Sequence, residues 1–373
     1  MRQLVCRGPY RIPKHTSRPD PSTACQVASE RGWHAPSMRE HPLARPTAHA
    51  SSAMPAQVWY GVRGLMHTRR SLQVSSQFTS PHADDTPLVS VLTPSYNQAA
   101  WLPDNLRSVA CQTYPNIEHI VMDGGSTDGS TEVLRAAGES VVWRTEPDKG
   151  QSDAINKAFR ASHGEIIGWI NSDDAYFDCS VVENVVAYFA AHPDIDVVYG
   201  HAAQIAEDGT IIWMIWVPWF MRRVLKIVNF IGQPVAFVRR TALSDPMLDV
   251  TYEFAMDYEL WLRLDREGRR FHRIPRIVAV DRHQSARKGV VMADVLQSDL
   301  GRLAETHGRG YPRGKRVLSW CFYTWRRFMG IFLIARIPDV LAFTDVRTSK
   351  WAILRRQALS WNRSWPRDYR PET

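Results

Sequence analysis

The chain has 373 residues, 44% of them hydrophobic, which is enough to bury a sizeable core. Its formal charge of +8 is uneven: residues 1–86 carry a net +6, residues 87–301 a net −8 and residues 302–373 a net +10. No run reaches the roughly 18 consecutive apolar residues that a transmembrane helix needs, so we expect the chain not to cross a membrane.

The first 86 residues are rich in Pro, Arg, His and Ser and lack the apolar run of a signal peptide. This composition predicts a disordered, basic leader. Met54 and Met66 lie within it, so a translation start downstream of Met1 is an alternative. The five cysteines are scattered, with no pair at metal-ligand spacing, which indicates a reduced, cytoplasmic compartment.

From Pro87 onwards, apolar runs alternate with helical patterns. Four runs, each ending in a polar loop, predict strands at 88–93, 117–123, 141–145 and 166–170. Helices are expected at about 101–112, up to 137, up to 162 and at 181–191. This order predicts an α/β fold with a mainly parallel sheet flanked by helices, and the polar loops should meet at the carboxyl edge of its strands.

The pattern then changes. Residues 197–216 predict a strand pair that turns at Asp208-Gly209. Residues 256–266 have helical periodicity, and residues 271–282 are expected to be extended.

Two polar loops carry the chemistry. The loop that starts at Asp123 adds glycines, including Gly125, and hydroxyls such as that of Ser126 before a helix, a combination that suits a nucleotide. Gly125 stands where an EF-hand needs an oxygen ligand, which disfavours calcium. After the fourth strand, Asp173 and Asp174 place two carboxylates side by side, which favours a bound Mg²⁺ or Mn²⁺ over a surface turn or a helix cap.

Four segments, TPSYN at 93–97, DGGSTDGS at 123–130, DKGQSDAINKAF at 148–159 and NSDD at 171–174, together resemble glycosyltransferase family 2, the inverting GT-A enzymes. The resemblance covers Leu88–His283. It implies a Rossmann-like nucleotide-binding half at 87–200 and an acceptor half at 201–300. A basic, amphipathic helical extension at 301–373 completes the predicted domains.

The resemblance also implies site roles. The metal ligands would be Asp173 and His283, although Asn171 replaces the first carboxylate of the family's metal motif. Residues matched to nucleotide-sugar binding are Pro94, Tyr96, Asp123, Gly125, Ser126, Asp148, Lys149, Asp153, Asn171, Asp174 and Arg287.

On the acceptor side, Asp257 matches the family's general base, because an ionised carboxylate can accept the proton of an acceptor hydroxyl. Met256 replaces the glutamate that usually precedes this base, so Glu259 is the alternative. Gln233, Pro234 and Trp261 are assigned to the acceptor side as well.

A stripe in the C-terminal flank predicts membrane attachment. Leu318, Phe322, Trp325, Met329 and Phe332 recur at helical spacing, beside Lys315, Arg316, Arg326, Arg327 and Arg336. Packing of this stripe against the catalytic domain is the alternative.

The implied function is transfer of a sugar from a UDP- or GDP-sugar to a glycan or lipid-linked hydroxyl, with inversion, for cell-surface glycan or glycolipid synthesis. The enzyme would need a divalent metal, bind no nucleic acid and lie on the inner face of the cell membrane. Alternatives are a nucleotidyltransferase or a non-catalytic, membrane-associated protein that binds nucleotide sugars. A Rossmann dehydrogenase is disfavoured, because Pro94-Ser-Tyr-Asn97 stands where Gly-x-Gly-x-x-Gly is required.

Overall fold

The computed structural model describes residues 86–284, 293–307, 315–337, 340–341 and 344–359. All of them belong to one compact unit, Gln77–Thr373. The predicted leader, apart from its last residue Thr86, lies outside the described residues.

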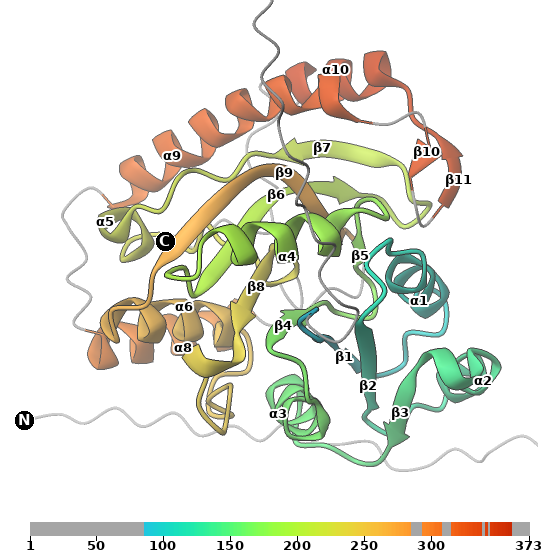
Figure 1. Ribbon diagram of the computed structural model, residues 1–373. Coiled ribbons are helices and arrows are strands. Elements are labelled where there is room, and N and C mark those ends of the chain that lie inside the picture. The colour runs from blue at the N-terminus through green and yellow to red at the C-terminus, as the bar shows by residue number, and fades with distance from the viewer. Residues whose placement is uncertain (1–85, 285–292, 308–314, 338–339, 342–343, 360–373) are drawn as a thin grey trace, which may run out of the picture. The chain divides into compact units, whose positions relative to one another are not determined.

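A mixed sheet forms the centre of this unit, with the strand order β3-β2-β1-β4-β8-β6-β9-β5 and β7 paired to β6 (Figure 1). The first four strands, in the order β3-β2-β1-β4, are parallel, as the sequence predicts. The strands are β1 (Val89–Ser95), β2 (Ile117–Asp123), β3 (Val142–Thr145), β4 (Ile166–Trp169), β5 (Ala175–Tyr176), β6 (Val197–Ile205), β7 (Ile211–Ile215), β8 (Ala236–Arg239) and β9 (Phe271–Arg282). Two short strands, β10 (Val340–Leu341) and β11 (Thr344–Arg347), pair separately.

The second half of the sheet departs from a purely parallel arrangement. β8, which the sequence analysis did not predict, pairs antiparallel with both β4 and β6. The expected hairpin forms between β6 and β7, and β9 runs parallel to β6. The fold is therefore α/β, with one half of the sheet parallel and the other half mixed.

Helices cover both faces of the parallel half. In β2, Ile120 and Met122 join the cluster that contains Ile155 of α3, whereas Val121 packs with Leu134 of α2, because successive strand residues point to opposite faces. The helices are α1 (Leu102–Ala110), α2 (Ser130–Ala136), α3 (Gln151–Ala161), α4 (Val181–Ala191), α5 (Arg222–Leu225), α6 (Met256–Arg266), α8 (Ala293–Thr306), α9 (Lys315–Gly330) and α10 (Lys350–Leu359). Short 3₁₀ helices include η3 (Gln233–Val235) and η5 (Ile331–Arg336).

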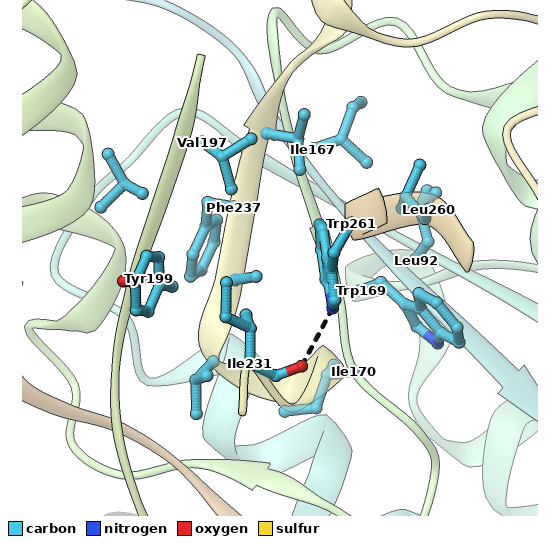
Figure 2. Close-up of a cluster of buried hydrophobic side chains, with 14 of the residues drawn as sticks. Leu92, Ile167, Trp169, Ile170, Val197, Tyr199, Ile231, Phe237, Leu260 and Trp261 are labelled. Carbon is cyan, nitrogen blue, oxygen red and sulfur yellow. Dashed lines mark hydrogen bonds between the residues drawn. The ribbon is translucent and has the colours of Figure 1, made fainter. Parts of the chain in front are cut away.

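One hydrophobic cluster runs through both halves of the sheet. It contains Leu92 of β1, Ile167 of β4, Tyr199 of β6, Phe237 of β8 and Trp261 of α6 (Figure 2). Because this cluster crosses the predicted boundary at residue 200, the two halves share a core.

Two cysteines that are distant in sequence meet in the fold. Cys111 at the end of α1 and Cys179 after β5 form a disulfide, with their Cα atoms 5.3 Å apart and a sequence separation of 68. Thr113 N also donates to Cys179 O at 2.7 Å. The interpretation of the cysteines as scattered is therefore wrong for this pair, because the contact arises only when α1 packs beside β5. This disulfide removes the argument for a reduced compartment that was based on cysteine spacing.

The C-terminal helices lie along β7 (Figure 1). α9 continues directly into η5, and α10 is tied to both neighbours: Gln357 accepts from Met214 N at 2.8 Å and donates to Arg327 O at 2.9 Å. Gly330 lies against Met214 and Gln357, where a side chain would have no room. In the described part of the chain, no helix has the length and apolar character to span a bilayer.

Candidate active site

Loops from two neighbouring strands are joined at the carboxyl edge of the parallel sheet. Asn97 N donates to Ser126 Oγ at 2.8 Å, and Thr127 N donates to Asn97 Oδ1 at 2.9 Å. Ala99 N adds a bond of 2.9 Å to Asp128 Oδ2. Asn97 has φ 53°, a left-handed conformation that asparagine tolerates better than most residues. These hydrogen bonds join the loops after β1 and β2, and we call the joined loops the rim.

Asp123 organises this rim from beneath. Its carboxylate is 1% exposed and accepts from Gly125 N at 3.2 Å, from Ser126 N at 2.9 Å and from Thr145 Oγ1 at 2.7 Å. Gly125 has φ 87°, a region that favours glycine. Asp123 thus shapes the predicted nucleotide loop chiefly through bonds within the protein.

Two predicted nucleotide contacts, Tyr96 and Asp148, converge next to Asp123. A methyl group on Gly124 would lie 2.6 Å from Asp148 Oδ2 and 3.3 Å from the ring of Tyr96, so these side chains border the same small space. The Tyr96 ring is 61% exposed. A flat aromatic ring beside a carboxylate can stack on a base and accept its hydrogen bonds.

Other residues of this predicted set have structural contacts. Pro94 is buried within β1, and Lys149 is exposed. Asp153 accepts from Lys149 N at 3.1 Å and pairs with Lys157 at 3.4 Å, which anchors the first turn of α3.

The turn that follows β4 is held by α1. Asn105 is fully buried, and its side-chain amide donates to Asn171 O at 2.9 Å and to Asp174 O at 3.1 Å. Asp174 is 4% exposed and accepts from Arg282 N and from Gln233 Nε2. Asp174 therefore stabilises the turn from inside and does not face the cleft.

Arg282, at the end of β9, fixes the same turn. Its side chain is 1% exposed and pairs with Asp104 Oδ2 of α1 at 2.6 Å. It also donates to the carbonyl oxygens of Asp173 at 3.0 Å and Glu207 at 2.9 Å. The sequence analysis missed this residue, because only the pairing of β9 with β5 and β6 brings it beneath the turn.

Asp173 is the carboxylate of the turn that suits a cation. It is partly exposed, and Asp173 Oδ2 accepts from Gln284 Nε2 at 2.6 Å. Asn171 is less suitable, because its Oδ1 already accepts from Gln151 Nε2 at 2.6 Å and Trp169 Nε1 at 3.1 Å. Mg²⁺ is commonly held by one or two carboxylates and substrate phosphates, which Asp173 fits. Among the described residues, no three His, Cys, Asp or Glu side chains gather closely enough to hold a metal ion.

His283, the second predicted metal ligand, is not the residue after β9 that contacts Asp173. Side chains of an extended segment alternate, so His283 is exposed while its neighbour Gln284 is 3% exposed and contacts Asp173. Within the described residues, Gln284 Oε1 has no hydrogen-bond partner, so a buried oxygen stands beside the predicted metal ligand. Arg287, predicted to meet the leaving group, lies outside the described residues.

Asp257, in the first turn of α6, has the properties of a base. Burial raises the pKa of its carboxyl from 3.8 to about 7, although a hydrogen bond from Asn229 Nδ2 at 3.0 Å acts in the opposite direction. Glu259 is 5% exposed and paired with Arg263 at 3.1 Å. Burial also raises the pKa of Glu259, but its carboxylate is committed to that ion pair. Asp257 is therefore the better placed candidate.

A short loop, residues 229–233, connects Asp257 to the turn after β4. Asn229 binds Asp257, and Gln233 Nε2 reaches Asp174 Oδ2 at 3.3 Å. Between them, Trp261 Nε1 donates to Ile231 O at 2.9 Å (Figure 2). Trp261 is 2% exposed and Pro234 is buried, so both support this 229–233 loop from below and neither offers a surface to an acceptor.

α3 makes a second connection between the turn after β4 and the region around Asp257. Gln151, its first residue, binds Asn171, and Ser152 Oγ contacts Met256 Sδ at 3.1 Å, next to Asp257. Contacts through α3 and through the 229–233 loop thus link the predicted base to the predicted metal turn.

Comparison with known proteins identifies related sequences. Residues 90–244 match the family model of Glycosyl transferase family 2. A PGL/p-HBAD biosynthesis glycosyltransferase of Mycobacterium tuberculosis (strain ATCC 25177 / H37Ra) is 31% identical over 118 residues, which are 31% of this chain and 46% of the relative. The chain thus spans just under half of that relative. An uncharacterized glycosyltransferase of M. tuberculosis (strain CDC 1551 / Oshkosh) is 26% identical over 266 residues, which are 65% of this chain and 92% of the relative.

Solved structures show more distant likenesses. A mannosyltransferase from Pyrobaculum calidifontis in complex with GDP-Man and Mn²⁺ has a TM-score of 0.48 and 20% identity, over 74% of this chain and 81% of its own. S. aureus TarS 1-349 in complex with UDP-GlcNAc has a TM-score of 0.46 and 15% identity, over 68% and 82%. Likenesses at this level support no assignment by themselves.

Arg282→Met should destabilise the fold by about 3 kcal/mol, because it leaves the Asp104 carboxylate and two carbonyl oxygens without their buried partner. Arg276→Met on the same strand is the control, since Arg276 is 42% exposed and makes surface contacts that contribute under about 1 kcal/mol. Urea unfolding measures both, and equal small effects would show that Arg282 does not anchor the turn.

Asp257→Asn should stabilise the fold above about pH 7. The pKa of Asp257 is raised in the folded state, so the folded protein keeps a proton that the unfolded chain releases between about pH 4 and pH 7, and stability falls as pH rises through this window. An amide avoids the cost of the buried charge, on the order of 3 kcal/mol.

Urea unfolding at about pH 8 and about pH 5 should show a gain that is larger at the higher pH. The exposed Asp294→Asn is the control and should show no such gain. A variant less stable than the wild type at about pH 8 would contradict the raised pKa.

Proposed function

We propose that this chain, in which residues 90–244 form a glycosyl transferase family 2 domain, transfers a sugar from a nucleotide-diphospho-sugar to a hydroxyl acceptor with inversion at the anomeric carbon. The observation that carries the proposal is the placement of Asp257 within this fold: Asn229 of the 229–233 loop binds its carboxyl group, and Gln233 of the same loop reaches the turn after β4. Burial raises the pKa of Asp257 to about 7. A base with this pKa is half ionised near neutral pH and has the basicity to accept a hydroxyl proton.

The reaction is a single displacement. Asp257 accepts the proton of the acceptor hydroxyl as the acceptor oxygen bonds to the anomeric carbon. The bond from that carbon to the diphosphate breaks on the opposite face, and its electron pair leaves with the nucleoside diphosphate. One displacement gives one inversion. Asn229 holds Asp257 through its bond of 3.0 Å and thereby fixes the direction of proton transfer.

Residues at the carboxyl edge would hold the donor. Tyr96 and Asp148 border the space proposed for the base, and the rim organised by Asp123 approaches the ribose and phosphates. Asp173, with Gln284 beside it, would hold Mg²⁺ or Mn²⁺, which when bound would offset the charge of the departing diphosphate. A UDP- or GDP-sugar is the proposed donor.

The acceptor class is proposed from the name of a relative. The M. tuberculosis relative is named for PGL/p-HBAD biosynthesis, and it is matched over less than half of its length. We therefore extend the proposal to cell-surface glycan or glycolipid synthesis, by an enzyme peripheral to the membrane.

One observation favours a second function, binding of nucleotide sugars without catalysis. Asn171 replaces a carboxylate, and its side-chain oxygen already accepts bonds from Gln151 and Trp169. A protein with this turn could bind a donor with a weakened metal site and transfer nothing.

Three variants test the assignment. Asp257→Asn should keep donor affinity within about twofold and lower kcat by roughly a hundredfold or more, because the acceptor proton then has no base. Asp173→Ala should lose metal-dependent donor binding. Glu259→Gln is the matched control and should retain transfer, since Glu259 pairs with Arg263. Calorimetry with UDP- and GDP-sugars and a transfer assay measure the two properties separately.

The outcomes separate the alternatives. An active Asp257→Asn with an inactive, folded Glu259→Gln would move the base to Glu259. Activity in both variants would remove the carboxylate-base mechanism. Donor binding by the wild type with no transfer to glycan or lipid-linked hydroxyl acceptors would favour the binding function.

A further inference from the structure

One side of α9 packs directly on the 229–233 loop. The Phe322 and Phe230 rings lie with their centroids 6.3 Å apart, and Trp325 meets Trp216 edge-on at 4.6 Å. Arg326 Nε donates to Trp216 O at 2.7 Å, and its Nη2 donates to Phe230 O at 3.3 Å. Phe230 follows Asn229, the partner of the proposed base. The position of α9 therefore affects the 229–233 loop, and through Asn229 it affects the proposed base Asp257.

The outward surface of α9 and of the following η5 exposes large apolar side chains. Trp320 is 57% exposed, Phe328 43% and Phe332 of η5 62%. A shallow groove between them is lined by Trp320, Cys321, Thr324, Trp325 and Phe328. We call the exposed set the aromatic face: Val317, Leu318, Trp320, Trp325, Phe328 and Phe332.

This surface differs from the predicted stripe. Phe322 and Met329 are partly buried, so the stripe is split between the protein and the outside. Arg326 and Arg336 bind carbonyl oxygens, and Arg327 lies over the Trp213 ring at 4.5 Å, so these predicted lipid contacts have partners within the protein. Helical spacing shows that a stripe exists but does not show which part of it tertiary packing covers.

The charge around the aromatic face has one predominant sign. Residues 315–359 contain nine Lys or Arg and two Asp, with no Glu. On α10, Lys350, Arg355 and Arg356 are exposed. On α5, Arg223 is exposed, and Arg222 is exposed but pairs with Asp265 at 2.7 Å. An excess of cations beside exposed tryptophan and phenylalanine is the composition of a helix that lies in the interface of an anionic bilayer.

We propose that the aromatic face docks on the surface of an anionic membrane and that the acceptor is accordingly a membrane-borne amphiphile with a free hydroxyl. Docking would set α9 at the headgroup level, with the 229–233 loop and Asp257 packed behind it. The docking step stands on the exposed face and the charge alone. The nature of the acceptor rests on the proposed function.

The test uses the full chain and two vesicle types, phosphatidylcholine alone and phosphatidylcholine mixed with phosphatidylglycerol. Binding should be confined to the anionic vesicles and should weaken as salt rises from about 0.05 M to about 0.5 M. Trp320→Ala combined with Phe328→Ala should weaken it by roughly tenfold or more, because both rings are removed from the interface. Val142→Ala with Val250→Ala is the matched control, since both valines are exposed elsewhere, and its affinity should stay within about twofold.

Equal binding by the aromatic and control variants, or no binding by the wild type, would overturn docking. So would a dimeric wild type that the aromatic variant converts to a monomer in sedimentation, because the face would then belong to a second copy. Vesicle binding needs no donor, so it can fail while the Asp257 tests succeed. Transfer to a water-soluble acceptor should be unchanged in the aromatic variant, whereas transfer to an acceptor embedded in anionic vesicles should fall. An equal rate with the embedded acceptor would overturn the assignment of the acceptor.

Discussion

The turn after β4, which carries the proposed metal ligand Asp173, depends on the contacts of the Arg282 guanidinium. This side chain is 1% exposed and joins the Asp104 carboxylate of α1 to the carbonyl oxygens of Asp173 and Glu207. A buried guanidinium is not solvated by water, so it requires several charged and hydrogen-bonding partners within the protein. The fold holds each of these partners in place. The backbone of Asp173 is therefore fixed from beneath, and its carboxylate is left partly exposed at the sheet edge. A site built this way holds its carboxylate in place before any ligand arrives.

The proposed acceptor side has a different constraint, a partly buried carboxyl group that has no cationic partner among the described residues. Asp257 has Asn229 as its side-chain partner, and burial raises its pKa to about 7. Ionisation there destabilises the fold, whereas the paired Glu259 has Arg263 to offset its charge. The same burial gives Asp257 the basicity that a proton acceptor needs near neutral pH. The 229–233 loop carries this carboxyl's partner, reaches Asp174 through Gln233, and supports α9 through Phe230.

The sequence predicted what depends on local order. The parallel strands, the hairpin, α4, α6 and β9 follow from periodicity and turn residues, residues 90–244 match the family 2 model, and the α/β fold is confirmed. The rest depends on long-range contacts. Arg282 and Asp104 are 178 residues apart, β8 is four residues long, and Cys111 meets Cys179 only through packing of α1 on β5. Which of His283 and Gln284 faces Asp173 is likewise set by the pairing of β9, not by a motif.

The central claim is that Asp257 accepts the acceptor proton with a pKa set by burial, and the pH dependence of kcat/KM tests it most directly. The account predicts an acidic limb near pH 7, below which kcat/KM falls about tenfold per unit while the donor dissociation constant stays flat. A profile that is level down to about pH 5, near the range of an ordinary carboxyl group, would contradict the account.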